Sequence, residues 1–309
     1  MGVGSRQGLL VAAMLVRTCG GLATPPGIIR ITDAASQRPI ILVGTMHYNP
    51  HSVRQVRATV SAAARHCGLH ATAIELCPSR WDSTAAARWQ ERRMDESNLK
   101  RVLSEDEFQV AWESTVACGL PDVVLADQPI ALTGRRLGAS LLSTPVDLLS
   151  PAGWRRVTTD LQAARRQLPT FVSAALHGKL LRGAPLAAAR YLYQSPAALP
   201  FIVLSTAALV VAAAVDEATG AVATWDDGVV TALVALVFGR AAFVSLIQER
   251  DRVLAHNIRK ACLAREQHAT VASRGAVVAV IGMAHLAGVR EALLEAETSD
   301  CRLQDERVR

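Results

Sequence analysis

The feature that most limits the fold is a run of 25 residues without a charge, from Tyr191 to Val215. A helix of this length can cross the hydrocarbon core of a bilayer. A second run, Gly228 to Ile247, has 20 residues and one charge, Arg240. At mid-membrane that charge costs about 2.5 to 3.5 kcal/mol unless it snorkels or pairs with a partner helix. The two runs predict an inserted hydrophobic hairpin that spans a membrane. The alternative is an Ala-rich helical pair buried in the protein or in a dimer.

Charges around the two runs are divided by sign. Acidic residues alone lie between the runs, and basic residues lie before and after them (Asp216, Glu217, Asp226 and Asp227 between; Lys179, Arg182 and Arg190 before; Arg250, Arg252, Arg259 and Lys260 after). This is the positive-inside pattern of a hairpin. Because a hairpin returns the chain to the side it left, we expect 33–190 and 248–309 to form one domain on the basic-flank side of the bilayer, with 191–247 inserted between them.

The net charge of +6 is concentrated in one block of the chain. Residues 134–190 carry nine Lys or Arg against Asp147 and Asp160. A local basic block beside an apolar run suits an anionic membrane surface. No nucleic-acid-binding motif accompanies it, and only 4% of the residues are aromatic, so nucleic acid is not an expected partner.

The first 32 residues have the composition of a targeting segment. They contain three arginines and no acid, and Gly8 to Val16 is a nine-residue apolar run that is too short to span a bilayer. The pattern fits either a secretory signal or an organellar transit segment. We expect a membrane location in an organelle, chloroplast or mitochondrion. The six cysteines form no C-x-x-C pair, so neither a disulfide framework nor a cysteine zinc site is expected.

Four short apolar runs predict an α/β fold. They cover 39–44, 71–76, 122–126 and 276–281, and stretches with helical character lie between them. Strands that alternate with helices are typical of βαβ units. We therefore predict a mostly parallel sheet flanked by helices.

Each predicted strand ends in a polar residue: His47, Glu75, Asp127 and His285. The carboxyl ends of parallel strands meet at one edge of a sheet, so these side chains are expected to converge. Two imidazoles and one or two carboxylates are ligands for a divalent metal such as zinc, manganese or cobalt, and a metal-bound water supports hydrolysis. Taken singly, each His could be an ordinary loop residue, and Asp before Pro is a common turn former. Glu75 lies in an apolar strand pattern, where a carboxylate needs a partner.

Five sequence blocks resemble the TraB family, which is related to the Tiki and PrgY proteins and has the fold of the erythromycin-esterase and ChaN-like group. The blocks are GTMH (44–47), AIELCPSR (73–80), LADQPI (125–130), ERD (249–251) and GMAH (282–285). The resemblance covers 39–135 and 248–290, and it implies an α/β domain with a metal site around His47, His285 and Glu75. Tiki-like members are metal-dependent proteases, PrgY-like members restrain a peptide pheromone, and other members sit on organelle membranes without a settled activity.

The sequence departs from the family at Gln128, where the family usually has the Arg of D-R-P. An arginine that could bind an anionic group is therefore missing, and Arg80 and Arg250 remain to serve that role. The stretch 191–247 is also more hydrophobic than in a soluble TraB protein.

Our first hypothesis is a membrane-anchored, metal-dependent hydrolase that acts on peptides. His47 and His285 are its expected ligands, and Glu75 is a ligand or general base. Asp127 orients a ligand histidine or binds the metal directly, while Arg80 and Arg250 hold a substrate carboxylate or the oxyanion. For Arg250 an ordinary ion pair with a neighbouring acid is an equal alternative.

Two other hypotheses remain open. The chain could be a non-catalytic, membrane-tethered protein that binds or regulates a peptide, or acts at an organelle membrane contact. It could also be a soluble homo-oligomer that buries the hairpin at its interface. The expected partners are accordingly a lipid bilayer, a peptide or protein, and a second copy of the chain.

Overall fold

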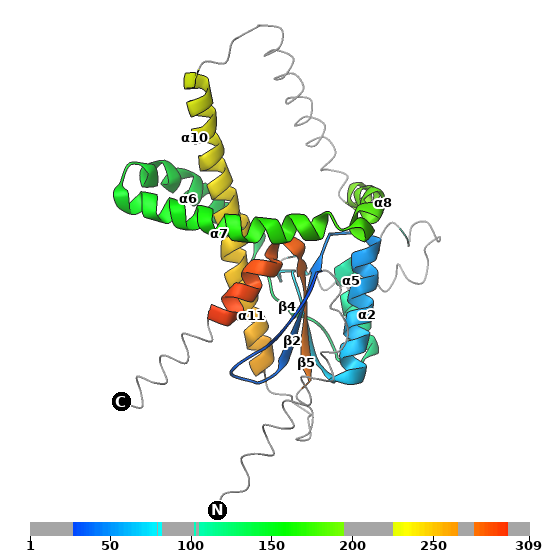
Figure 1. The fold of residues 1–309 in the computed structure, drawn as a ribbon. Coiled ribbons are helices and arrows are strands. Elements are labelled where there is room, and N and C mark those ends of the chain that lie inside the picture. The colour runs from blue at the N-terminus through cyan, green and yellow to red at the C-terminus, as the bar shows by residue number, and fades with distance from the viewer. Residues whose placement is uncertain are drawn as a thin grey trace, which may run out of the picture.

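A computed structural model describes residues 27–78, 80–81, 102, 105–194, 225–264 and 275–295. Its centre is a sheet with helices on both faces, and a long helix rises away from it (Figure 1). The α/β prediction is confirmed. The predicted targeting segment, up to residue 26, and the first predicted span from residue 195 onward lie outside the described residues.

The sheet has five strands in the order β1-β2-β5-β3-β4, and all but one of its neighbouring pairs are parallel. The strands are β1 (Ile28–Thr32), β2 (Pro39–Thr45), β3 (Leu69–Ile74), β4 (Val124–Leu125) and β5 (Ala276–Gly282). β5 comes last in the chain but lies between β2 and β3. This crossover brings β5 beside residues more than 200 positions earlier in the chain.

β1 was not predicted, because its residues were assigned to the N-terminal segment 1–32. It pairs antiparallel with β2 at the edge of the sheet, with Ile28 opposite Val43 and Thr32 opposite Pro39. The sheet therefore begins before residue 33. The predicted strand over 71–76 instead runs from Leu69 to Ile74, so Glu75 is the first residue beyond the strand.

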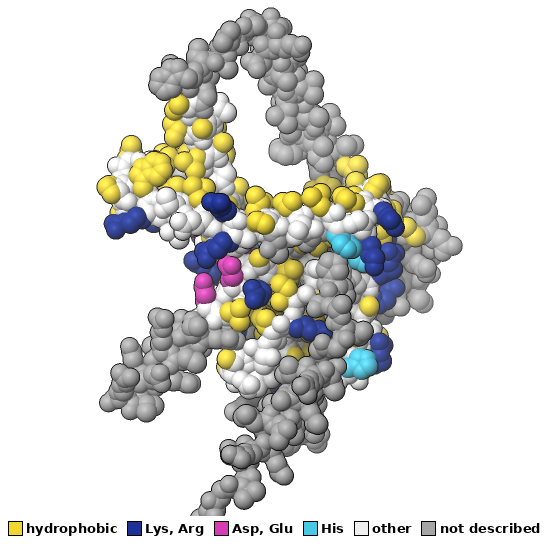
Figure 2. All heavy atoms as spheres, in the orientation of Figure 1, with side chains coloured by type: hydrophobic (Ala, Val, Ile, Leu, Met, Phe, Trp, Pro, Cys, Tyr) yellow, Lys and Arg dark blue, Asp and Glu magenta, His cyan; other side chains and the backbone are white. Residues whose placement is uncertain are grey.

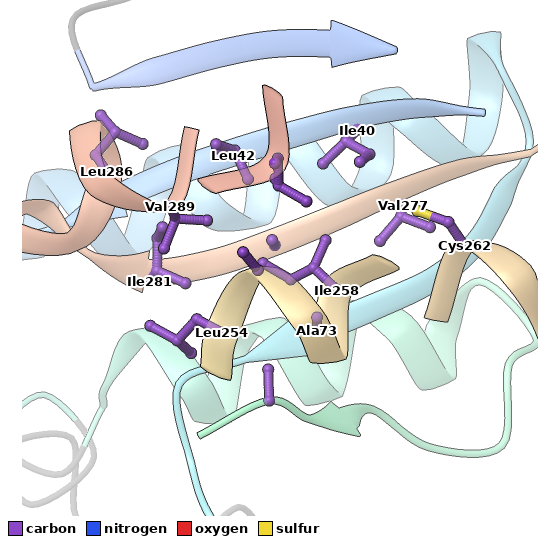
Figure 3. Close-up of a cluster of buried hydrophobic side chains, with 14 residues drawn as sticks. Ile40, Leu42, Ala73, Leu254, Ile258, Cys262, Val277, Ile281, Leu286 and Val289 are labelled. Carbon is purple, nitrogen blue, oxygen red and sulfur yellow. The ribbon is translucent and has the colours of Figure 1, made fainter. Parts of the chain in front are cut away.

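Alternating strand residues supply the two halves of the core. Ile40 and Leu42 point to the face covered by α11 (Glu249–Leu263) and the helical residues 286–295 (Figure 3). Ile41 and Val43 point to the opposite face, where α2 (Pro50–His66) and α5 (Glu107–Ala117) pack. Every residue of β5 is buried, as expected for a central parallel strand.

The start of α2 positions the loop that carries His47. Asn49 caps this helix by accepting a hydrogen bond from the backbone N–H of His51, and Pro50 follows in the first turn, where the missing N–H of proline has no cost. The amide of Asn49 also donates to the carbonyl of Leu180 at 2.9 Å. The loop after β2 is therefore held from two sides.

A layer of helices crosses one end of the sheet. It contains α6 (Ile130–Leu148), α7 (Pro151–Ala175) and α8 (Gly178–Gln194), and Figure 1 shows α7 running across the top of the sheet. α10 (Trp225–Ala242) continues through the π-helical turn η1 (Phe243–Gln248) into α11. Residues Val229–Leu263 form one helix that is long and apolar enough to cross a membrane by length and composition.

Arg240, the one charge in the second apolar run, is buried against partner helices. Its guanidinium lies 2.8 Å from Asp147 of α6 and 2.8 Å from Asp160 of α7, and it donates to Thr144 at 3.0 Å. A fully paired arginine avoids the cost of an isolated buried charge. The sequence analysis allowed for a partner helix that pairs with this residue, and two helices, α6 and α7, each supply an acid.

Candidate functional site

His47 lies in the loop after β2, and Glu107 in the first turn of α5 holds it. One carboxylate oxygen of Glu107 contacts the imidazole Nδ1, and the other accepts the backbone N–H of Tyr48 at 3.0 Å. Tyr48 has a φ of 60°, a conformation that needs such support in a residue with a side chain. Burial opposes protonation of His47, but the Glu107 contact outweighs it and raises the pKa. The side chain of His47 is 49% exposed, so solvent reaches this histidine.

His285 lies in the short 3-10 turn after β5 (η2, Met283–His285) and is buried. Its Nδ1 is 2.7 Å from Asp251 Oδ1 in the first turn of α11, and its Nε2 is 3.4 Å from Glu75 Oε1. Burial disfavours the imidazolium, yet the contacts with Asp251 and Glu75 raise its pKa to about 9. Both histidines therefore have Nδ1 against a buried carboxylate and Nε2 turned toward the site.

Gly282, at the end of β5, marks the point where the side chains meet. A Cβ atom added to this glycine would lie 3.1 Å from Glu75 Oε2, 3.5 Å from His285 Cδ2 and 3.6 Å from His47 Nε2. The backbone N–H of Gly282 donates to Glu75 Oε2 at 2.5 Å. A side chain here would fill the space between the three groups. The structure thus brings together His47, Glu75 and His285, as the strand ends predicted.

Glu75 is buried at the centre of an ion cluster. Burial opposes its ionisation, but the hydrogen bond from His285, the charges of His285 and Arg250, and the Gly282 N–H lower its pKa to about 2. The carboxylate is therefore anionic at neutral pH. Its Oε1 is also in contact with the Arg250 guanidinium, so both oxygens have partners.

Asp127 lies beside this cluster and binds two arginines. Arg250 donates to its carboxylate through Nε at 3.1 Å and through a terminal nitrogen at 2.8 Å, and Arg80 donates at 2.5 Å. The hydrogen bonds of Asp127 thus go to arginines and to the N–H of Gln128. The predicted orientation of a histidine is performed by Asp251 instead. Arg250 does form an ion pair, but with acids from other elements at the site.

Gln128 is buried and makes structural contacts. Its amide nitrogen donates to Thr133 at 2.9 Å, and its oxygen accepts from Arg136 at 3.1 Å. Arg136 also pairs with Glu249 at 3.1 Å. These bonds link the start of α6 to the start of α11.

The donor set has the chemistry of a metal site, but its members pair with each other. Among the described residues, no three His, Cys, Asp or Glu side chains are arranged to hold a metal ion as they stand. Two imidazoles with carboxylate-held Nδ1 atoms and one carboxylate nevertheless suit a divalent ion of borderline softness. An ion there competes with Arg250 for Glu75 and with a proton on His285.

Sequence reasoning missed Glu107 and Asp251. Each lies in the first turn of a helix, on the same face as the buried apolar residues that follow it at helical spacing (Val110 and Ala111 in α5; Leu254, Ala255 and Ile258 in α11). An acid on an apolar helix face must find a partner. That pattern was visible in the sequence, although the partner was not.

A model of the TraB/PrgY/gumN family matches residues 27–122. The match includes His47, Glu75, Arg80 and Glu107, and it ends before Asp127 and the C-terminal half of the site. No curated protein gives a significant match to the chain.

Proposed function

From the match of residues 27–122 to the TraB/PrgY/gumN family, we propose that the protein is a membrane-anchored hydrolase that uses a divalent metal ion to cleave peptides. One observation carries the proposal. Two histidines, each held at Nδ1 by a buried carboxylate, meet Glu75 around Gly282. Carboxylates that fix the far nitrogen of an imidazole are typical of metal-binding histidines.

His47 and His285 would hold the metal through Nε2, with Glu75 as the third ligand or as the base. When bound there, such an ion supplies a water whose pKa lies near neutrality. Glu107 and Asp251 keep the two rings in position, so little freedom has to be lost when a ligand binds. His47 is the exposed member of the set, so substrate reaches the site from its side.

Arg80 and Arg250 would bind the negative charge of the substrate. Both guanidinium groups already face carboxylates of the cluster, and Arg80 is exposed. A guanidinium can hold a carboxylate or an oxyanion through two N–H groups. A free peptide carboxylate therefore fits this end of the site.

The apolar helix beginning at Val229 would anchor the protein in a membrane, which we place in an organelle because residues 1–26, before β1, contain two arginines and no acid. Carbonate washing of membranes tests the anchor. We expect the protein to stay with the lipid fraction, and its recovery in the aqueous phase would overturn the anchoring proposal.

The metal is tested by measuring bound metal in the purified full chain. We expect about one divalent ion per chain in the wild type and a loss of most of it in the double variant His47→Ala, His285→Ala. His256→Ala is the matched control, because this exposed histidine lies on α11 away from the site. Unchanged metal content in the double variant would overturn the metal assignment.

The positioning of His47 is tested with Glu107→Gln, which keeps the side-chain shape. We expect a 10- to 100-fold loss of metal affinity, the usual cost of removing such a partner. Glu113→Gln, on the same helix, should leave the affinity unchanged. Equal affinities in the two variants would remove Glu107 from the site.

The substrate class is tested with a mixture of peptides that have either free or amidated C-termini. We expect the metal-loaded protein to cleave the free peptides at least tenfold faster, and we expect Arg80→Ala to remove this preference. Absence of cleavage by the metal-loaded protein would contradict the hydrolase proposal.

A further inference from the structure

The helix α6 has its apolar side chains on the outside. Leu142 and Val146, with Leu149 directly after the helix, recur at helical spacing and are exposed, with Leu142 at 78% and Leu149 at 87%. Its buried residues include Thr144 and Asp147, which contact Arg240. A helix on a water-soluble protein has the opposite arrangement. The outer face of α6 is therefore built for an apolar surrounding.

α7 repeats the arrangement. An exposed apolar stripe follows its outer face at intervals of seven or four residues (Trp154, Leu161, Leu168, Val172 and Leu176). Its buried face carries Asp160, which pairs with Arg240, and Gln167. Figure 2 shows hydrophobic atoms along the edge of α7 on the side toward which α10 rises. An apolar surface that extends over two helices indicates an interaction site.

All charges on the exposed surface of these helices are basic. The two acids between residues 130 and 194, Asp147 and Asp160, are turned inward and paired with arginines. Arg155 and Arg166 are exposed beside the apolar stripe of α7, and Arg165 is exposed within it. An apolar stripe flanked by arginines suits the boundary between lipid tails and anionic headgroups. An acidic protein surface could pair with the arginines but would leave the apolar stripe exposed, so the surface favours an anionic bilayer.

The length of α10 requires that this layer reach into the bilayer. The acids Asp226 and Asp227 lie at the far end of α10, and from there to Arg240 the helix rises about 20 Å. The hydrocarbon core is about 30 Å thick. If the helices at the level of Arg240 sink about 5 to 10 Å below the headgroups, as interfacial helices do, the two lengths agree. Arg240 and Arg156 together balance the charges of Asp147 and Asp160, and this pairing suits that depth.

We propose that α6 and α7 form a platform that lies in the surface of an anionic bilayer, with their outer apolar stripes among the lipid tails and α10 crossing beside them. The proposal rests on the anchoring by α10 proposed above, and it is independent of the chemistry at the site. It adds a second membrane contact, one that fixes the orientation of the sheet domain.

The platform brings the candidate site close to the lipid surface. A Cβ atom added to Gly288 would lie 2.7 Å from Gln167 Nε2 on α7 and 1.8 Å from Asp251 Oδ2, beside the ring of His285. Only α7, a helix about 10 Å across, therefore lies between the site and the lipid tails. Substrates that are held at the membrane surface would be favoured.

The test uses the full chain reconstituted into two kinds of vesicles, phosphatidylcholine with phosphatidylglycerol and phosphatidylcholine alone. Lipids brominated near the headgroup quench the fluorescence of tryptophans at that depth. The difference between the wild type and Trp154→Phe gives the share of the fluorescence that comes from Trp154. We expect this share to be quenched at least twofold in the anionic vesicles and clearly less in the neutral ones. Equal quenching in both would overturn the assignment to an anionic surface.

Two double variants with the same charge change provide the control. Leu161→Glu with Leu168→Glu places acids on the apolar stripe, and Thr159→Glu with Gln162→Glu places them on the exposed polar flank of α7. We expect the first pair to abolish quenching of Trp154 and the second to retain most of it. Equal losses in the two would show that net charge, rather than the stripe, makes the contact.

Flotation of the vesicles separates this proposal from the anchor. If the chain floats with the vesicles but Trp154 is not quenched, the platform proposal is overturned and the anchoring proposal holds. A dimer in that sample would show that the apolar stripe contacts a second copy of the chain. If the chain does not float, both the anchor and the platform are overturned.

Discussion

The sheet domain and the platform differ in where they carry charged and large apolar side chains. In the sheet, the residues between the strands and α11 are aliphatic, as in Ile40, Leu42 and Ile258. In the platform, the contacts with α10 include the buried ion pair of Arg240 with Asp147, while Leu142, Leu161 and Leu168 lie outside. With α6 and α7 in lipid, as proposed above, each region would be ordinary for its own solvent, water in one case and lipid in the other. A periodic apolar stripe thus identifies one face of a helix. Only the charges around the stripe indicate whether that face contacts the protein core or lipid.

Removal of Arg240 should produce the largest effect, because the platform depends on this side chain. Arg240→Ala leaves Asp160 without Arg240, while Asp147 keeps Arg156, and breaking a buried ion pair in this way costs about 3 to 5 kcal/mol. We expect the free energy of unfolding to fall by this amount when it is measured by urea unfolding in detergent micelles. Arg155→Ala, an exposed arginine of α7, should change it by less than about 0.5 kcal/mol. Equal effects would mean that the pairs do not hold the platform.

The sheet should respond to the loss of apolar volume instead. Ile258 is fully buried on α11, and truncation to Ala at such sites costs about 2 to 5 kcal/mol. Leu263→Ala is the matched variant, since Leu263 ends the same helix and is exposed. We expect a change below about 0.5 kcal/mol there. A small loss for Ile258→Ala would contradict the assignment of this face as the core.

Much of the sheet was predictable because its strands are continuous apolar runs. β2 and β5 lie close to their predicted bounds, and their parallel pairing places His47 and His285 at one edge. β1 escaped prediction because five residues at an edge acquire strand character only through the partner β2. Local sequence does not contain that pairing.

The centre of the candidate site was more predictable than its support. Glu75 drew attention as an acid in an apolar strand, and the structure supplies Arg250, His285 and Gly282 as its partners. Glu107 and Asp251 were missed because their roles depend on which histidine each meets, and this is decided by tertiary packing. The outward direction of the apolar stripes of α6 and α7 was not predictable either, since their spacing is the same as in a helix that packs on a core.

Buried acids offer a third way to separate the regions. Hydrogen bonds from Arg156 hold the pKa of Asp147 in the platform below its ordinary value. Burial and the neighbouring charge of Glu107 raise the pKa of Asp106, the cap of α5, to about 7. Folded Asp106 therefore keeps a proton that the unfolded chain releases above about pH 4, the ordinary value of an Asp.

The sign of the pH effect follows from that difference. Because the folded state binds more protons, stability falls as the pH rises from about 4 to about 7, by at most about 1.4 kcal/mol per pH unit for this group. Asp106→Asn keeps a cap oxygen and should flatten this part of the profile, whereas Asp122→Asn, at an exposed acid, should not. Urea unfolding at pH 5 and pH 7 measures this change in the free energy of unfolding. Identical slopes in wild type and Asp106→Asn would contradict the assignment.

The smallest effect on folding is expected at Leu142, and there the two regions differ most clearly. Leu142→Ser removes an apolar side chain that is already exposed, so the free energy of unfolding in lipid-free detergent should change by less than about 0.5 kcal/mol. In anionic vesicles the same variant should weaken the quenching of Trp154, because about 1.5 to 3 kcal/mol of transfer free energy is lost with a buried leucine. Leu254→Ser, in the sheet core, should show the reverse: a large loss of stability, with quenching retained in the fraction that stays folded. If both variants destabilise the fold equally, the outer stripe of α6 is packed against protein, and the contrast between the two regions disappears.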